Sequence, residues 1–473
     1  MGTERGLGRI VPVLAFAGII VALTQTLVIP LVPNLPGLLG SPPSDTAWAV
    51  TSTLLAAAVV TPVIGRLGDM YGKRRMLLVS VAMLVLGSVV CAVSDSLGPM
   101  VVGRVMQGLS AGVIALGISI MRDEVPQHRL ASATAAMSAS LGVGGALGLP
   151  IAAFIADNAD WHVLFWLSAV LGLLAGGLIF LLVPESPQRT GGRFDLAGAA
   201  GLSIVLACLL LAISKGGDWG WGSGRVLGLV AVSVAAGAVW TWWELRTPSA
   251  LVDLRTLARG QVLLTNVASI VFGFSMFALA LVLPQILQLP SATGYGMGQT
   301  MLAAGLVMAP NGLVMMAMAP VSARITRTAG PKVTLIVGAA VVATGYGLGA
   351  VFMAEIWQLV VSSCVIGAGI GLAYGALPSL VMAAVPVTQT AAANSVNTLM
   401  RSIGTAVAST VCGLLLAQLT TPFGGVELPS LTGFRVVMAM GAAAALVALC
   451  VASFLPGRET PAVNEKAIPS TTR

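Results

Sequence analysis

Apolar residues are concentrated in fourteen runs of about twenty residues each, separated by short polar stretches. A helix of about twenty apolar residues crosses the hydrocarbon core of a bilayer, where its backbone must satisfy its own hydrogen bonds. Alternation with period two is absent, which argues against a β-barrel. We therefore expect an all-α membrane protein with fourteen transmembrane helices. The predicted spans are 10–33, 46–65, 76–93, 97–121, 131–155, 161–184, 196–214, 225–243, 261–286, 297–322, 332–353, 356–383, 390–418 and 432–455.

The composition agrees with this pattern. Of the 473 residues, 57% are hydrophobic and 9% are charged, whereas about a quarter of a soluble domain is charged. The five cysteines all lie inside apolar runs and show no ligand-like spacing, so we interpret them as small buried apolar residues. The sequence therefore predicts neither a metal site nor a cofactor.

The basic residues orient the predicted spans. With the N-terminus in the cytoplasm, about 19 Lys and Arg residues fall on the cytoplasmic side and about three on the other side. The loss of one span would place every later loop on the wrong side, so both termini are expected to be cytoplasmic. The basic excess then reflects membrane orientation and not nucleic-acid binding. Abundant Ala, Gly and Val favour a bacterial cytoplasmic (inner) membrane.

The chain carries a weak internal repeat. The segment Pro62–Arg74 aligns with Pro320–Lys332, and Ser140–Gly144 aligns with Met400–Gly404 at nearly the same offset. Two like halves around a central cavity are a common plan of transporters. We expect an N-terminal six-helix bundle at residues 1–184 and two inserted helices with a linker at 185–260. A second, pseudo-symmetric six-helix bundle would cover 261–455, followed by a disordered cytoplasmic tail at 456–473.

Five charged residues gather in the short connection between the second and third spans. They are Arg66, Asp69, Lys73, Arg74 and Arg75, interleaved with Gly65, Gly68 and Gly72. The glycines permit a tight turn and a close approach of helices. Asp69 can cap a helix or pair with Lys73 or Arg74. The alternative is an ordinary basic loop that only sets the topology.

This connection resembles the signature of the major facilitator superfamily between its second and third helices, although Met70 stands where a basic residue is usual. The segment Arg104–Gly108 resembles the second motif of that family. The segment Gly142–Pro150 resembles its antiporter motif, with a displaced proline and with Ala152-Ala153 in place of the closing glycine pair. Fourteen spans and Arg401 resemble the fourteen-helix drug:proton antiporter branch.

The resemblance implies a conformational latch at the cytoplasmic side. Asp69 would pair with Lys73 and with Asp123, and would lie near the N-terminus of the eleventh span, where the helix dipole favours an anion. An ordinary solvated helix end remains the alternative for Asp123. The expected latch residues are Gly65, Gly68, Asp69, Gly72, Lys73, Arg74 and Asp123.

The first span lacks the acid that is usual in this branch, because Thr24 stands in its place and Gln25 follows. No acidic residue is predicted deep in a span, whereas Arg104 and Arg401 are. An intramembrane ion costs about 3 kcal/mol or more and is a functional candidate by default. Helix carbonyls and nearby amides holding each arginine are the alternative. The candidates for coupling or the cavity are Thr24, Gln25, Arg104, Gln107, Gly108 and Arg401.

Other polar side chains within the spans are candidates for the substrate cavity, since they need partners in lipid. With a methionine that suits a multidrug pocket, they are Asn266, Gln285, Asn311, Met315, Asn394 and Asn397. Packing between helices is the alternative for each of them. With arginine as the deep charge, neutral, amphipathic or anionic substrates are expected rather than multivalent cations. A coupling proton would travel on Asp69, on Asp123 or on the substrate.

The sequence predicts a secondary active transporter that exports amphipathic small molecules or drugs by alternating access coupled to the proton gradient. An importer, or an uncoupled facilitator of small organic solutes or lipid-like molecules, is the alternative. We find no Ser/His/Asp grouping, HExxH motif or nucleotide-binding loop, so an enzyme is not expected. The expected partners are a small-molecule substrate, protons and the lipid bilayer, without nucleic acid, and the protein is expected to be a monomer.

Overall fold

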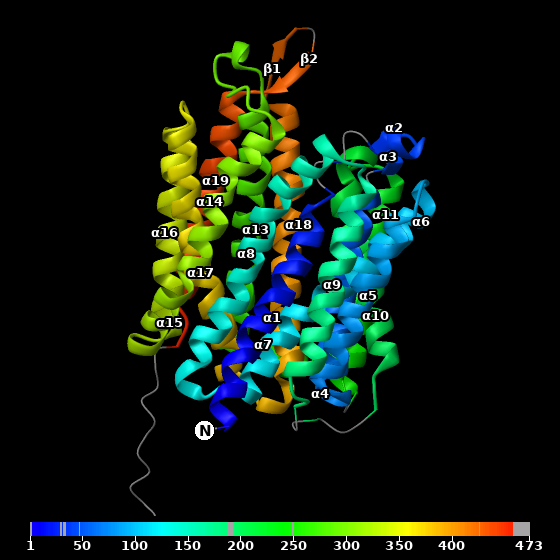
Figure 1. Ribbon diagram of the computed structural model, residues 1–473, viewed down its shortest axis with the longest axis vertical. Coiled ribbons are helices and arrows are strands. Elements are labelled where there is room, and N and C mark those ends of the chain that lie inside the picture. Colours follow the sequence, from blue (N-terminus) through cyan, green and yellow to red (C-terminus); the bar gives the residue numbers. More distant parts are fainter. Residues whose placement is uncertain are drawn as a thin grey trace, which may run out of the picture.

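Among the described residues, fourteen helices are long and apolar enough to cross a membrane, which confirms the predicted number. Figure 1 shows them in the computed structural model, running lengthwise through one bundle. The structure describes residues 2–456 except 29–30, 32–34, 47, 187–188, 190–192, 248–249 and 425. The tail predicted to be disordered covers 456–473, and beyond residue 456 it lies outside the described residues.

The spans form two halves separated by an inserted pair. The N-terminal half contains α1 (Gly2–Thr26), α4 (Trp48–Tyr71), α5 (Lys73–Ala92), α6 (Leu97–Gly108), α7 (Val113–Glu124), α8 (Gln127–Asn158) and α9 (His162–Leu182). The inserted pair is α10 (Leu196–Trp219) and α11 (Gly224–Arg246). The C-terminal half contains α13 (Gly260–Gln288), α14 (Met301–Ala317), α15 (Ala319–Thr328), α16 (Pro331–Val351), α17 (Ile356–Ala384), α18 (Thr390–Gln418) and α19 (Leu431–Ser453).

Two spans consist of two helices each. A 3-10 turn at Leu109–Gly112 joins α6 to α7, and α15 follows α14 after Met318. The shorter elements are α2 (Leu35–Leu39), α3 (Pro43–Thr46), α12 (Leu254–Leu257) and the 3-10 turns Ser291–Thr293 and Val387–Gln389. A small antiparallel hairpin, β1 (Thr420–Phe423) with β2 (Val426–Pro429), adds a β element that the sequence did not predict. The hydroxyl of Tyr295 donates to the Pro429 carbonyl oxygen at 2.7 Å and holds this hairpin to the loop before α14.

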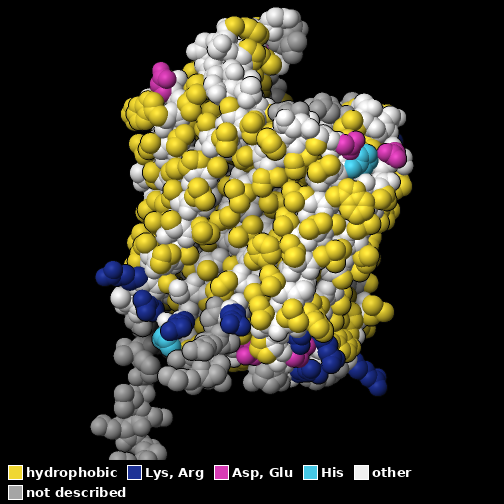
Figure 2. All heavy atoms as spheres, in the orientation of Figure 1, with side chains coloured by type: hydrophobic (Ala, Val, Ile, Leu, Met, Phe, Trp, Pro, Cys, Tyr) yellow, Lys and Arg dark blue, Asp and Glu magenta, His cyan; other side chains and the backbone are white. Residues whose placement is uncertain are grey.

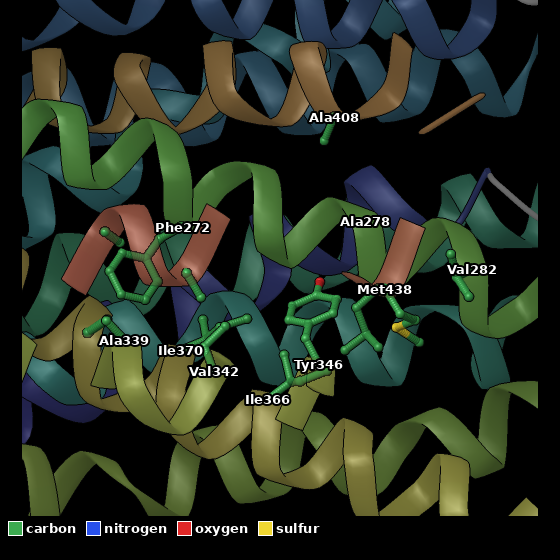
Figure 3. Close-up of a cluster of buried hydrophobic side chains, with 14 of the residues drawn as sticks. Phe272, Ala278, Val282, Ala339, Val342, Tyr346, Ile366, Ile370, Ala408 and Met438 are labelled. Carbon is green, nitrogen blue, oxygen red and sulfur yellow. The ribbon is translucent and has the colours of Figure 1, made fainter. Parts of the chain in front are cut away.

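Each half has its own apolar core. Figure 3 shows part of the C-terminal core, where the Tyr346 ring lies among Ile366, Ile370 and Met438. The Tyr346 hydroxyl reaches the Ser275 carbonyl oxygen on α13, so the buried ring also satisfies its polar end. The halves meet where α4 packs along α18 and where α8 packs along α14 and α17. In the predicted repeat α4 corresponds to the span of α14 and α15, and α8 corresponds to α18. The α4–α18 and α8–α14 interfaces are therefore equivalent to each other in the repeat.

The inserted pair covers the seam between α4 and α18. Leucines of α10 form a buried cluster with Ala58 of α4 and with Val396 and Leu399 of α18. The hydroxyl of Thr410 on α18 donates to the Ile213 carbonyl oxygen at 2.8 Å. Helix α11 packs on α10 and leaves Leu227, Val234 and Val239 exposed, as expected of a lipid-facing helix.

The surface carries a broad apolar belt, and Lys and Arg gather at one end of it (Figure 2). We call this the basic end. It includes the N-terminus, the connection between α4 and α5, and the end of α7 at Glu124. Helix α4 extends to Tyr71, whereas the predicted span stopped at 65, because the charged residues that end the apolar run are covered by other helices. Asp69 and Glu244 are buried in the last turns of α4 and α11 near this end, beyond the predicted limits of their spans.

Candidate functional site

Three charged residues of the N-terminal half form a buried cluster at the basic end. The Lys73 Nζ atom lies 2.6 Å from Asp123 Oδ2 and 3.9 Å from Asp69 Oδ1. Lys73 is fully buried and Asp69 is almost so. An isolated buried charge is strongly unfavourable, and the two carboxylates compensate the charge of Lys73. The pairing of Asp69 and Asp123 through Lys73 is the one that the family resemblance implied, and it excludes the solvated alternative for Asp123.

Asp69 also connects the two halves. Its Oδ2 accepts from the Ala392 amide at 2.9 Å, and its Oδ1 accepts from the Ala391 amide at 3.3 Å. These amides open α18, where the helix dipole favours a negative charge. The expected helix was the eleventh span, residues 332–353, and that expectation was wrong. The eleventh span forms α16, which packs against α17 and α19 and does not border α4, whereas α18 is the thirteenth span.

The glycines of this region serve different purposes. Only Gly72 forms the turn, with a φ of 117° that side chains other than glycine rarely adopt. Gly65 and Gly68 lie within α4 and form no turn. A Cβ atom at Gly65 would lie 2.8 Å from the Ala391 carbonyl oxygen, so this glycine permits close contact with α18. A Cβ atom at Gly68 would meet the Leu116 side chain of α7.

Arg122 is a second link between the halves, and the sequence analysis did not single it out. Its Nη1 donates to Thr390 Oγ1 at 2.6 Å, and its Nη2 donates to the Val385 carbonyl oxygen at 3.1 Å. It thus joins the end of α7 to the end of α17 and the start of α18. The one indication of this role in the sequence is that Arg122 directly precedes Asp123.

Arg74 does not belong to this contact, contrary to prediction. Its guanidinium donates to the Phe180 carbonyl oxygen and lies 5.3 Å from the centroid of the Phe180 ring. Its backbone amide donates to Glu185 Oε1 at 3.2 Å. Because it opens α5 on the side that faces the end of α9, Arg74 ties two parts of the same half together.

Arg104 is fully buried and holds three helices of the N-terminal half. Its Nε donates to the Ala49 carbonyl oxygen at 2.7 Å, and its Nη1 donates to Gln107 Oε1 at 2.7 Å and to the Thr24 carbonyl oxygen at 3.3 Å. Gln107 in turn donates to Ser88 Oγ at 2.9 Å. Gly108 fits closely against the backbone of Thr53 on α4. The geometry therefore matches the alternative in which carbonyls and an amide hold the arginine.

Gln25 follows Thr24 near the end of α1 and is half-buried. The Thr24 hydroxyl donates to the Ile20 carbonyl oxygen at 2.8 Å, so only its carbonyl group faces Arg104. The structure therefore brings Thr24, Arg104 and Gln107 together. It gives the Thr24 hydroxyl a role within its own helix.

Arg401 on α18 is also buried, but it has fewer hydrogen-bond acceptors than Arg104. Its guanidinium lies 4.7 Å from the centroid of the Tyr374 ring, and its Nη2 donates to Thr398 Oγ1 at 3.3 Å. Among the described residues no carboxylate lies within ion-pair distance of Arg104 or Arg401. A cation over an aromatic face is stabilised, but most donors of this guanidinium remain available to a ligand or water.

The amide candidates divide into two groups. Asn397 donates to Asn266 Oδ1 at 3.0 Å and to Ser269 Oγ at 2.7 Å, so these side chains brace α18 against α13. The buried oxygens Asn394 Oδ1 and Asn311 Oδ1 have no hydrogen-bond partner. Met315 is buried between the halves and contacts Gly142 and Gly371, whereas Gln285 is half-buried on α13. The structure does not gather all the cavity candidates at one point.

A bundle of fourteen apolar helices in two halves joined by polar contacts is a common plan among membrane transporters. A profile of the Major Facilitator Superfamily matches residues 14–409, and the chain belongs to this family. The members of the family are transporters and not enzymes.

Several relatives and solved structures are similar to the chain. An uncharacterized MFS-type transporter of Mycobacterium tuberculosis is 28% identical over 86% of this chain, which spans 59% of that protein. The tetracenomycin C resistance and export protein of Streptomyces glaucescens is 28% identical over 89% of this chain and 79% of that protein. A putative multidrug resistance protein, MdtD, of Pectobacterium carotovorum is 24% identical over 87% of both proteins.

The solved structures support the fold. The human organic anion transporter MFSD10 has a TM-score of 0.66 at 16% identity and covers 94% of this chain and 99% of that chain. The proton:xylose symporter XylE has a TM-score of 0.65 at 16% identity, with coverage of 96% and 97%. At this identity the likeness concerns the fold alone.

Proposed function

We propose that this protein exports amphipathic small molecules across a bacterial cytoplasmic membrane by alternating access. The names of two relatives, a tetracenomycin C export protein and a multidrug resistance protein, support export of drug-like molecules. The distribution of Lys and Arg supports a cytoplasmic position for the basic end and for both termini. We further propose a monomer that draws its energy from the proton gradient.

The contact between the halves at the basic end is the observation that carries this proposal. The Asp69 carboxylate accepts two hydrogen bonds from α18, and the Arg122 guanidinium donates two to the C-terminal half, and together these contacts close the cytoplasmic side. Such contacts break and form again without unpacking either core. Residues 1–184 and 261–455 would then rock against each other, while the inserted helices at 185–260 move with the seam that they cover. The conformation described would be the one closed to the cytoplasm.

Arg401 supports a preference for neutral or anionic amphipathic substrates. A buried guanidinium with available donors favours an acceptor or an anion, and no described carboxylate lies at its depth to pair with a multivalent cation. Tyr374 and Met276, which contact each other at 3.4 Å, add an aromatic and an adaptable apolar wall on the same side.

Transport into inside-out membrane vesicles tests the proposal, because an exporter accumulates its substrate there. We expect uptake of neutral and anionic dyes that collapses when an ionophore abolishes the proton gradient. Asp69→Asn removes the charge that holds α18, and uptake should fall by about tenfold, equivalent to about 1.4 kcal/mol.

Arg75→Gln is the matched control for this change. Arg75 is a basic-end residue whose partly exposed contact with Glu185 stays within the N-terminal half, so uptake should remain close to wild type. Accumulation confined to right-side-out vesicles would indicate an importer and contradict export. Uptake that ignores the ionophore would contradict proton coupling.

A further inference from the structure

Two buried carboxylates lie on the inserted helices, apart from the latch and from the two deep arginines. Asp195 caps the start of α10, and Glu244 lies in the last turn of α11. Their side chains are 8% and 4% exposed. A Cβ atom at Gly198 would contact carboxylate oxygens of both residues, so the two groups crowd over the first turn of α10.

The two carboxylates have unequal partners. Asp195 accepts from the Gly198 amide at 2.8 Å, and both its oxygens accept from the Trp243 indole at 3.1 Å. Neither oxygen of Glu244 accepts a hydrogen bond of normal geometry. The Trp240 indole and the amides of Leu251 and Val252 face it without completing such a bond. Donors therefore surround the Asp195 carboxylate, and Glu244 is the group of the two that is suited to hold a proton.

The surroundings of the pair favour a proton on Glu244. Among the described residues no basic group lies within ion-pair distance of Asp195 or Glu244. A buried charge on Glu244 beside a second carboxylate is unfavourable, and a proton on Glu244 relieves the repulsion. The three donors that face Glu244 stand ready to accommodate its charged form after a small shift, so the site accepts and releases a proton without a large rearrangement.

A cavity of about 430 Å³ at the basic end has Glu244 among its lining residues, although the carboxylate oxygens themselves are buried. Its other charged lining residues are Arg66, Arg246, Asp253 and Arg255. The same cavity is lined by Ala392, whose amide binds Asp69. Arg66 lies one turn before Asp69 on α4, and its buried Nε has no hydrogen-bond partner. A charge on Glu244 thus faces the cation that neighbours the latch.

We propose that Glu244, with Asp195 as its charged neighbour, is a proton-binding site that couples protonation at the cytoplasmic side to the contact between the halves. This inference rests on the proposed transport function and names a carrier for its coupling ion. When Glu244 is protonated, Arg66 supports the charge of Asp69 and the latch stays closed. When Glu244 loses its proton, it attracts Arg66 across the cavity, and the link between Asp69 and α18 weakens.

Labelling with dicyclohexylcarbodiimide tests proton binding without any transport. This reagent modifies protonated carboxyl groups in apolar surroundings, and mass spectrometry locates the modified residue in the full-length protein in membranes. We expect labelling of Glu244 at neutral pH that disappears as pH rises, and no labelling of the exposed Glu355. Asp195→Asn removes the neighbouring charge, so the pH at which labelling disappears should fall. Unlabelled Glu244 at every pH, or an unchanged pH dependence in Asp195→Asn, would overturn the proposal.

Transport by Glu244→Gln tests the coupling itself. In proteoliposomes this variant should still exchange substrate without a gradient but lose most of the several-fold stimulation by an imposed pH gradient. Glu185→Gln, which removes another basic-end carboxylate, should keep both activities. A wild-type pH response in Glu244→Gln would refute the coupling role. If the wild-type protein moves none of the tested substrates, the proposed export function fails, and the labelling result still decides the proton site.

Discussion

At the scale of single residues, the two intramembrane arginines differ in their environment although the sequence presents them alike. Arg104 has three acceptors, whereas Arg401 has one weak acceptor and the face of the Tyr374 ring. The sequence predicted the depth of both residues from the surrounding apolar runs. It did not indicate which carbonyl groups reach them, because those carbonyls belong to helices far away in the chain.

This difference predicts opposite consequences for the two alanine variants. Arg104→Ala should lower the free energy of unfolding by about 3 kcal/mol, since it leaves buried acceptors unsatisfied. Arg401→Ala should unfold close to wild type but lose most transport of anionic substrates. Denaturant unfolding in detergent and vesicle uptake measure the two effects. Equal loss of stability in both variants would contradict the assignment.

At the scale of secondary-structure elements, the contact between α4 and α18 depends on the absence of a side chain at Gly65. The Ala391 carbonyl oxygen approaches the place that a Cβ atom would occupy, and backbone cannot move aside as a flexible side chain does. The sequence predicted close helix approach at the glycines of this region. It also predicted a tight turn, which the structure places at Gly72, while α4 continues through Gly65 and Gly68 because other helices bury its charged end.

Gly65→Ala should therefore destabilise the protein by about 1–3 kcal/mol through overpacking, with a lower midpoint of thermal unfolding in detergent. Gly177→Ala, on the exposed face of α9 where an added Cβ meets no neighbour, provides the control. That variant should unfold at or slightly above the wild-type temperature, since alanine favours a helix. Similar midpoints for the two variants would show that the α4–α18 contact tolerates a separation.

At the scale of the whole molecule, the two halves pack through two equivalent interfaces, and contacts among α4, α7, α17 and α18 close the basic end. Transport by alternating access requires these contacts to separate in every cycle. A covalent link across them should stop the cycle while leaving the two cores intact.

The pair Gly68→Cys and Ala391→Cys tests this requirement. An ideal Cβ at Gly68 lies 3.9 Å from the Ala391 Cβ, a separation that suits a disulfide. The oxidised double variant should lose nearly all uptake, and a reducing agent should restore it. Each single variant is the control and should be insensitive to oxidation. Full activity of the oxidised, cross-linked protein would mean that the basic end does not open.

The sequence by itself determined the fourteen spans, because an apolar run long enough to cross a bilayer satisfies its backbone only as a helix. Its motifs also led to the family to which the chain belongs. Only the tertiary structure decided that α18 receives Asp69, that Arg122 rather than Arg74 joins the halves, and that Glu244 meets Asp195. These pairings depend on how helices distant in sequence pack together, and hydropathy along one chain carries no information about which helices become neighbours.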